Sequence, residues 1–366
     1  MLNNVTGKQT KRMVKVHNKL SVPRDTSHWI VSGTNTFRLA SKKILSSLRD
    51  TPFINFGGNR ANIEKSMRRI WCADKGYKLL QRDQGGAEAL IVAYLCKDGN
   101  YRALFRNGIK PHTFIALHVF KEQFKKYFDP DKINIACDTK IDDLKKLDFW
   151  KELDKLVKSS DEWHHNERYY FIGKKIVHAS SYGMGANKYR MSVLEESGGT
   201  IVLSKMDAEL HLMTFFKLFP EIHGWHARIY EQVKKFKELR NLFGFPFAFT
   251  GYVDESNIRE AYAFIPQSTV GTITNIAITE TQEYIEEHNK DWHILNNDHD
   301  SMVVEAPDNE TDIRECSLVM KQYIEKEFIS PVDKCKFKMR SGLSIGYNWA
   351  PYKEKENPGG LKEVEE

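Results

Sequence analysis

The pattern of apolar and polar positions changes twice along the 366-residue chain. Between Ser32 and Leu95, short apolar runs are separated by Gly and Asn, which predicts strands and turns. From about His112 to Phe245, apolar residues recur every three or four positions, which predicts amphipathic helices. Strand character returns from Trp292 to Val304 and from Lys336 to Trp349. This order predicts a sheet-rich unit interrupted by a helical insertion.

Three helical segments are expected within the insertion. The first follows the stripe from Phe114 to Tyr127, and the second contains Leu210 to Leu218. The third runs from Trp225 to Leu239, and the Gly244 and Pro246 positions predict that it stops there.

Composition narrows the class of protein without assigning a function. No apolar run approaches the roughly 18 residues that a membrane helix needs, and no signal-peptide core is visible at the N-terminus. The net charge of +6 is compatible with nucleic-acid binding but too small to establish it. Five scattered cysteines without a CxxC pair argue against disulfides and structural zinc, and favour a reducing cytoplasm, that of a host if the protein is viral.

Two aspartates more than two hundred positions apart have settings suited to a metal ion. Asp83 follows the apolar segment Tyr77–Leu80, so we expect it at the end of a strand. Asp300 lies between Trp292–Leu295 and Met302–Val304, so we expect it in the turn of a hairpin. Each could instead be an ordinary capping or turn aspartate. If the fold brings them together, they can hold two divalent cations on a phosphoryl group.

Lys174, His178 and Tyr182 recur every four residues between the two aspartates, so one helix would place all three on one face. A cationic and aromatic helix face opposite a carboxylate pair predicts a site for a nucleoside triphosphate. The alternative is that Lys174 is an ordinary solvated lysine and that His178 packs inside the helical region.

With these motifs in this order, residues 30–350 resemble the family A DNA polymerases, the DNA polymerase I-like enzymes. Three segments carry the resemblance: Leu79–Glu88, Lys174–Gly183 and His299–Pro307. Four shorter segments agree with it: Thr34–Ser41, Arg68–Trp71, Pro111–Ala116 and Gly346–Trp349.

The resemblance implies an α+β right-hand fold, with an antiparallel-sheet palm, a helical fingers insertion and a thumb that is missing or minimal. The expected divisions are a basic arm or thumb remnant (1–30), palm (31–100), fingers (101–250), palm (251–350) and a flexible tail (351–366). The implied activity is template-directed extension of a primer 3′ end on DNA with deoxynucleoside triphosphates.

The resemblance also implies roles for individual residues. Asp83 and Asp300, with the backbone carbonyl of Gln84, would hold two Mg²⁺ ions about 3.5–4 Å apart, for which Mn²⁺ can substitute. Lys174, which completes the catalytic set with the two aspartates, and His112 would contact the triphosphate. The other expected nucleotide-binding residues are Glu88, His178 and Tyr182, with Glu88 excluding a 2′-hydroxyl. The expected DNA contacts are Arg38, Arg68, Gly183, Gln267 and His299.

Several positions depart from the family pattern. Ser301 replaces the acid that follows the second aspartate, and Tyr170 replaces an arginine. Few residues precede Thr34, so we expect a minimal distributive enzyme or one half of a split polymerase whose thumb and exonuclease lie on a second chain. The loosened motifs suggest a phage or mobile-element origin. Two alternatives stay open: an enzyme like the single-subunit RNA polymerases, and an inactive subunit that binds primer–template.

Overall fold

The computed structural model describes residues 67–163 and 168–365. Before residue 67 it describes Thr34, Thr36, Ile63 and two antiparallel strand pairs. These pairs are β1 (His28–Ile30) with β2 (Ala40–Lys42), and β3 (Ile44–Ser46) with β4 (Ile54–Phe56). Arg38 and most of the expected basic arm lie outside the described residues.

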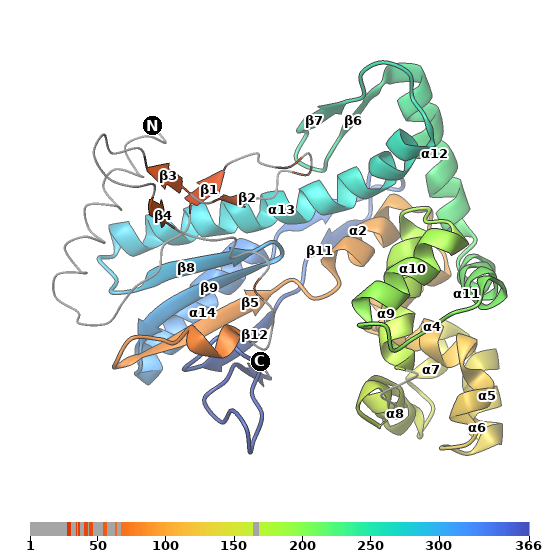
Figure 1. The fold of residues 1–366 in the computed structure, drawn as a ribbon, viewed down its shortest axis with the longest axis horizontal. Coiled ribbons are helices and arrows are strands. Elements are labelled where there is room, and N and C mark those ends of the chain that lie inside the picture. The colour runs from red at the N-terminus through yellow and green to blue at the C-terminus, as the bar shows by residue number, and fades with distance from the viewer. Residues whose placement is uncertain are drawn as a thin grey trace.

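A five-stranded antiparallel sheet lies in the half of the molecule that holds both ends of the described chain (Figure 1). Its strand order is β13-β12-β5-β9-β8. The strands are β5 (Tyr77–Asp83), β8 (His293–Asp298), β9 (Ser301–Pro307), β12 (Gly342–Gly346) and β13 (Lys362–Val364). The early strand β5 therefore pairs on both sides with strands from the end of the chain.

Both faces of the sheet are covered. Successive side chains on a strand point to opposite faces, and each face packs against its own apolar cluster. Leu80 and Val304 belong to the main core, together with Met320 of α14 (Glu310–Ile324). Leu79 and Val303 instead form a small cluster with Trp349 on the other face. The two-sided burial explains why the centre of β5 is a continuous apolar pair rather than an alternating pattern.

The helix α13 (Glu255–Glu287) is 33 residues long and contacts α14, β8 and β9 (Figure 1). It begins at a capping box, in which the Asp254 side chain accepts a hydrogen bond from the Asn257 amide at 2.9 Å. The sequence pattern does not predict this helix. It is obscured because Pro266 and buried hydroxyl residues such as Thr272 interrupt the apolar period.

The helical half of the molecule lies on the opposite side from the sheet (Figure 1). We call residues 87–236 the helical part, and residues 67–86 with 255–365 the sheet part. The helices of the helical part are α2 (Ala87–Leu95), α3 (Asn100–Arg106), α4 (Pro111–Val119), α5 (Lys121–Phe124), α6 (Pro130–Asp138), α7 (Ile141–Leu144), α8 (Trp150–Trp163), α9 (Tyr169–Ser181), α10 (Ala186–Glu196), α11 (Lys205–Leu218) and α12 (Glu221–Phe236).

Short elements complete the described fold. The ribbon of β6 (Glu238–Arg240) and β7 (Pro246–Ala248) connects the helical part to α13, and β10 (Glu327–Ile329) pairs with β11 (Lys336–Lys338) after α14. A 3₁₀ turn, η1, spans Arg68–Ile70. In the described part of the chain, no helix is both long enough and apolar enough to span a membrane.

Three sequence expectations were wrong at the edges of elements. Residues 87–95, expected as strand and turn, form α2, in which Ala87, Ile91–Ala93 and Leu95 are buried. The helix expected to reach Leu239 ends at Phe236, because Lys237 has a left-handed φ of 51° and the next residues pair as β6. The expected flexible tail instead contributes β13, which pairs with β12.

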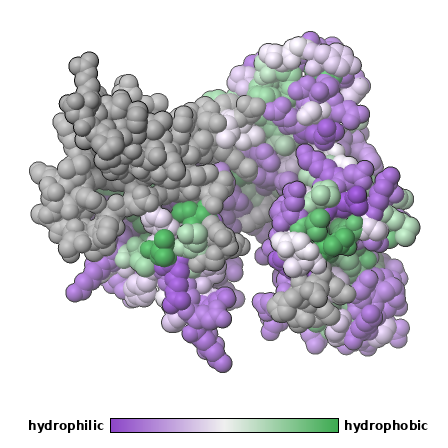
Figure 2. Space-filling view, in the orientation of Figure 1, coloured by the Kyte–Doolittle hydropathy of each residue, from purple (hydrophilic) through white to green (hydrophobic). Residues whose placement is uncertain are grey.

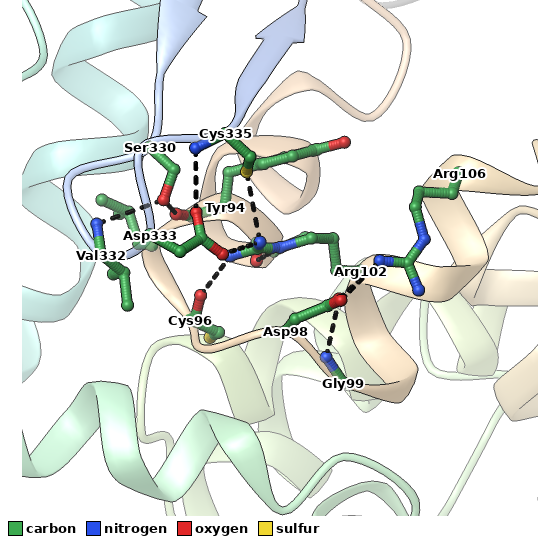
Figure 3. A network of polar contacts seen from close by, with 12 residues as sticks. Tyr94, Cys96, Asp98, Gly99, Arg102, Arg106, Ser330, Val332, Asp333 and Cys335 are labelled. Atoms are coloured by element: carbon green, nitrogen blue, oxygen red, sulfur yellow. Dashed lines mark hydrogen bonds and ion pairs between the residues drawn. The ribbon is translucent and has the colours of Figure 1, made fainter.

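A buried arginine joins the two parts (Figure 3). Arg102 is 3% exposed and donates to the Ala93 carbonyl at 3.2 Å, to the Cys96 carbonyl at 2.5 Å and to the Asp333 carboxylate. Hydrogen bonds from Cys335 and Arg102 hold the pKa of Asp333 well below its usual range. Because an arginine buried this deeply needs its donors satisfied, the network fixes the start of the helical part against the β10–β11 loop.

Candidate active site

The fold brings the two predicted aspartates together. Asp83 ends β5, where it pairs with Ser301 across the sheet, so Asp300 is adjacent to it. The Gln84 amide donates to the Asp300 carbonyl at 3.0 Å, which ties the end of β5 to the β8–β9 turn. His299 in that turn has a φ of 60°, a left-handed conformation that the two-residue hairpin requires.

Electrostatic repulsion accompanies this proximity. Burial, followed by the negative charge of Asp83 and then those of Asp298 and Glu88, raises the pKa of Asp300 to about 7. Two carboxylates that disfavour each other's ionisation are stabilised when a cation lies between them. The arrangement therefore has the electrostatic character of a cation site.

The donor set fits a hard divalent cation that keeps part of its hydration shell. Within residues 67–163 and 168–365, no group of three or more His, Cys, Asp or Glu side chains could hold a metal. Two carboxylates, those of Asp83 and Asp300, would leave coordination positions for water and substrate phosphate, which is the usual coordination of Mg²⁺. The Gln84 carbonyl accepts from the Ala87 amide at 3.0 Å but has a second lone pair for a ligand role.

A pocket of about 170 Å³ lies between the sheet part and the helical part. The surface is hollowed between these two parts in the space-filling view (Figure 2). The pocket is lined by six of the residues predicted for the site: Glu88, His112, Lys174, His178, Tyr182 and Asp300. It therefore places a cationic and aromatic helix face opposite a carboxylate, as the sequence spacing predicts.

The position of α9 depends on one glycine. A Cβ atom on Gly173 would lie only 2.6 Å from the His112 carbonyl oxygen and 3.1 Å from the Ala116 Cβ. The absence of a side chain thus lets α9 approach α4 closely, which brings Lys174 and His112 to the same pocket. The Lys174 ammonium also lies 4.6 Å from the centre of the Tyr170 ring, which occupies the position of the expected arginine.

Histidine 112 contributes to the pocket as a neutral group. Burial, followed by the charges of Lys174 and Lys110, lowers the pKa of His112 to about 3. A neutral imidazole can donate or accept a hydrogen bond but carries no charge toward a phosphate. The cationic character of the pocket therefore comes from Lys174.

Glu88 and Tyr182 form a pair at the junction of α2 and α9. The Tyr182 hydroxyl donates to the Glu88 carboxylate, and Tyr182 is buried. The His178 ring lies 4.9 Å from the Tyr182 ring, nearly perpendicular to it. The hydrogen bond fixes the Glu88 side chain at the wall of the pocket.

The four described residues expected to contact DNA lie outside this pocket's lining. Arg68 is already engaged, since it contacts the Asp298 carboxylate at 2.9 Å, the Ile63 carbonyl at 3.1 Å and the Trp349 ring at 4.1 Å. Gly183 has a φ of 66° and packs on Tyr262, and Gln267 is half-buried on α13.

His299 is in the turn beside Asp300, where Thr274 bonds its carbonyl. The other residues that line the pocket were not predicted as site residues, and Ser181 and Val270 are two of them. Ser181 lies seven positions after Lys174, so helical spacing could have identified it, whereas Val270 on α13 has no local signal.

A larger cleft of about 630 Å³ lies between the α2–α3 loop and the start of α12. Its charged groups are largely paired: Asp98 with Arg106 at 2.6 Å, and Glu221 with the Tyr101 amide at 2.5 Å. Because it gathers neither the aspartates nor the α9 face, we assign the chemistry to the smaller pocket.

Comparisons with known proteins agree with the resemblance. The family model described as DNA polymerase family A matches residues 144–351, more than half of the chain. DNA polymerase I of Treponema pallidum (strain Nichols) is 21% identical over 87% of this chain and 27% of its own length. The thermostable DNA polymerase I of Thermus filiformis is 22% identical over 81% of this chain and 30% of its own length. The chain thus spans about a third or less of these relatives.

A solved structure shows the same fold. The POL domain of Pol1 from M. smegmatis, in complex with DNA primer-template and dNTP, has a TM-score of 0.58 and 16% identity. The match covers 88% of this chain and 48% of that chain. The α+β polymerase architecture expected from the sequence is thereby confirmed. On the strength of the family match, the chain belongs to DNA polymerase family A.

Proposed function

We propose that this chain extends a primer 3′ end on a DNA template with deoxynucleoside triphosphates. The observation that carries the proposal is the pocket in which Asp300 of the sheet part faces Lys174 and His178 of α9 and Tyr182, which follows that helix directly. Family membership supports DNA synthesis in general, and the solved relative was determined with primer-template and dNTP. In this account the sheet part is the palm and the helical part is the fingers.

The residues of the chain have separate tasks in this proposal. Asp83 and Asp300 would hold Mg²⁺, which supplies activation of the primer hydroxyl and neutralisation of charge on the leaving pyrophosphate. Lys174 would bind the triphosphate as a point charge on a rigid helix. His112, being neutral, would donate a hydrogen bond to a phosphate oxygen.

The remaining pocket residues would select and hold the nucleotide. His178 and Tyr182 would stack on the nascent base pair, an interaction that tolerates any base. Glu88, held by the Tyr182 hydroxyl, would occupy the space of a ribose 2′-hydroxyl. That contact favours deoxynucleotides, and hence the DNA polymerase hypothesis over the RNA polymerase alternative.

A primer-extension assay on a defined DNA template tests the proposal. Wild-type chain with Mg²⁺ should extend the primer, and Asp83→Asn or Asp300→Asn should lower the rate by about 10³-fold, because each removes a charged ligand. Asp308→Asn is the matched control, since Asp308 lies at the far end of β9 and pairs with Lys78 at 2.7 Å. Extension that survives both aspartate changes would contradict the metal assignment, and a wild-type chain that adds no nucleotide would favour the inactive-subunit alternative.

A further inference from the structure

A threonine on α13 lies between the two segments that carry the aspartates. The Thr274 hydroxyl accepts a hydrogen bond from the Gln84 side-chain amide at 2.8 Å. The same hydroxyl lies 3.1 Å from the His299 carbonyl and 3.1 Å from the Val270 carbonyl one turn earlier on α13, and it can donate its single hydrogen to either. Gln84 follows Asp83 directly and His299 precedes Asp300 directly. One buried oxygen therefore connects the residue beside each carboxylate.

This connection has few substitutes. Thr274 is fully buried, and Gln84 is 1% exposed. The Gln84 Nε2 atom donates to Thr274, and the Gln84 Oε1 atom has no hydrogen-bond partner within the described part of the chain. Without Thr274 the whole buried amide would be unsatisfied, which costs more than the loss of one exposed hydrogen bond. The nearest parallel link is the backbone bond from the Gln84 amide to the Asp300 carbonyl at 3.0 Å.

The β5–β9 pairing ends at Asp83 and Ser301, and beyond that point the backbone bond from Gln84 to Asp300 is the continuation of the strand contact. A second bond through a rigid helix fixes both distance and orientation, because α13 is anchored against α14 and the sheet. Mutation of a group that hydrogen-bonds to metal ligands and orients them commonly lowers metal affinity by about 10–100-fold. The contact thus has the geometry to control how well the two carboxylates converge on one cation.

We propose that the Thr274 hydroxyl is a positioning group that sets the separation of Asp83 and Asp300 by linking Gln84 to the His299 carbonyl. The inference rests on the proposed function, because it requires that the two aspartates bind a divalent cation. It adds that affinity for this cation depends on α13, a helix that supplies no carboxylate to the pair.

Mn²⁺ binding to the full chain, measured directly by electron paramagnetic resonance, tests this role without relying on activity. Thr274→Val keeps the shape of the side chain but removes the hydroxyl that contacts Gln84, His299 and Val270, so it should weaken Mn²⁺ binding about tenfold. Thr274→Ser keeps the hydroxyl and should bind like the wild type. Gln84→Met breaks the same link from the other side and should match Thr274→Val, which keeps the test valid if the valine variant fails to fold.

Thr281→Val is the matched control, since Thr281 is fully buried on the same helix and its hydroxyl has no partner among the described residues. It should leave Mn²⁺ binding unchanged, while thermal unfolding of each variant reports any general loss of stability. Equal Mn²⁺ affinity in wild type, Thr274→Val and Gln84→Met would overturn this inference alone. A wild-type chain whose Mn²⁺ binding is absent, or is unaffected by Asp300→Asn, would overturn the proposed function and this inference together.

Discussion

In the sheet part, backbone pairing holds the two aspartates together, whereas in the helical part side-chain packing positions the residues that face them. Asp83 is the register partner of Ser301, which follows Asp300 directly, so the proximity of the two aspartates follows from the strand order. Lys174 instead depends on the close approach of α9 to α4 at Gly173. The comparison shows that strand pairing brings the two aspartates together, with Thr274 of α13 as a further link, while the basic side of the pocket depends on helix packing.

The two parts also respond to protons in opposite directions. Asp300 in the sheet part has a raised pKa, so its stabilising contribution is complete below pH 3.8 and is lost as the pH rises through about 7. Buried histidines in the helical part have lowered pKa values, about 3 for His112 and about 4 for His211 and His226. Their contribution is present above pH 6.5 and is lost as the pH falls.

The largest effect should come from the charge on α9. Lys174→Ala should lower kcat/KM for the deoxynucleotide by about 10²–10³-fold, because it removes the charge that faces the phosphates. The neighbouring Lys175 is the control, since it pairs with Glu196 on another side of the helix. Steady-state primer extension compares the two variants. A similar loss in Lys175→Ala would show that α9 matters for packing rather than for phosphate binding.

A smaller effect should appear in sugar selection. Glu88→Ala removes the side chain that Tyr182 holds at the pocket wall, so discrimination against ribonucleotides should fall by about 10–100-fold. Glu88→Gln keeps the size and should retain most of the discrimination. Competing single-nucleotide incorporation of dNTP and rNTP measures both variants. Unchanged selectivity in Glu88→Ala would remove the gating role.

A divalent cation should offset the electrostatic repulsion between Asp83 and Asp300, and the size of this effect should depend on pH. Because protons compete with Mg²⁺ for Asp300, the Mg²⁺ concentration needed for half-maximal effect should rise by up to about tenfold per pH unit below pH 7. Mg²⁺ should therefore raise the unfolding temperature more at pH 8 than at pH 5.5. Thermal unfolding with and without Mg²⁺ measures the difference. Asp300→Asn should abolish it, and an equal Mg²⁺ effect at both pH values would refute the competition.

The smallest predicted effect concerns acid stability of the helical part. Below pH 6.5 the buried histidines must take up protons as the chain unfolds, so the free energy of unfolding should fall by roughly 1 kcal/mol per pH unit for each of them. His211→Gln should reduce this slope, whereas a change at the exposed His223 should not. Unfolding curves followed by tryptophan fluorescence between pH 7 and 4 give the slope. A slope that is the same in wild type and His211→Gln would count against burial as its cause.

Features with a local period could be predicted from the sequence. The strand that ends at Asp83, the hairpin around Asp300 and the helix face of Lys174, His178 and Tyr182 each depend on a spacing of two or four residues. That Asp83 adjoins the Asp300 turn, and that Asp300 shares a pocket with the Lys174, His178 and Tyr182 side chains, could be expected only from the order of motifs that resembles the family.

Features that depend on distant partners could not be predicted in this way. Arg68 looked available for DNA, but Asp298 and Trp349, more than two hundred residues away, engage it. The strand β13 is polar and exposed, so nothing in its own residues marks its pairing with β12. Thr274 is an ordinary threonine until the fold places it between Gln84 and His299.

The account's central claim is that the acidic sheet part and the basic helical part form one nucleotide site. Mn²⁺ titration by electron paramagnetic resonance, with and without a dNTP, tests it most directly, because ligands of a shared site must alter each other's affinity. We predict that the dNTP tightens Mn²⁺ binding in the wild-type chain and that either Asp300→Asn or Lys174→Ala removes the enhancement. Mn²⁺ and dNTP binding that are independent of each other, or coupling that survives both changes, would contradict the claim.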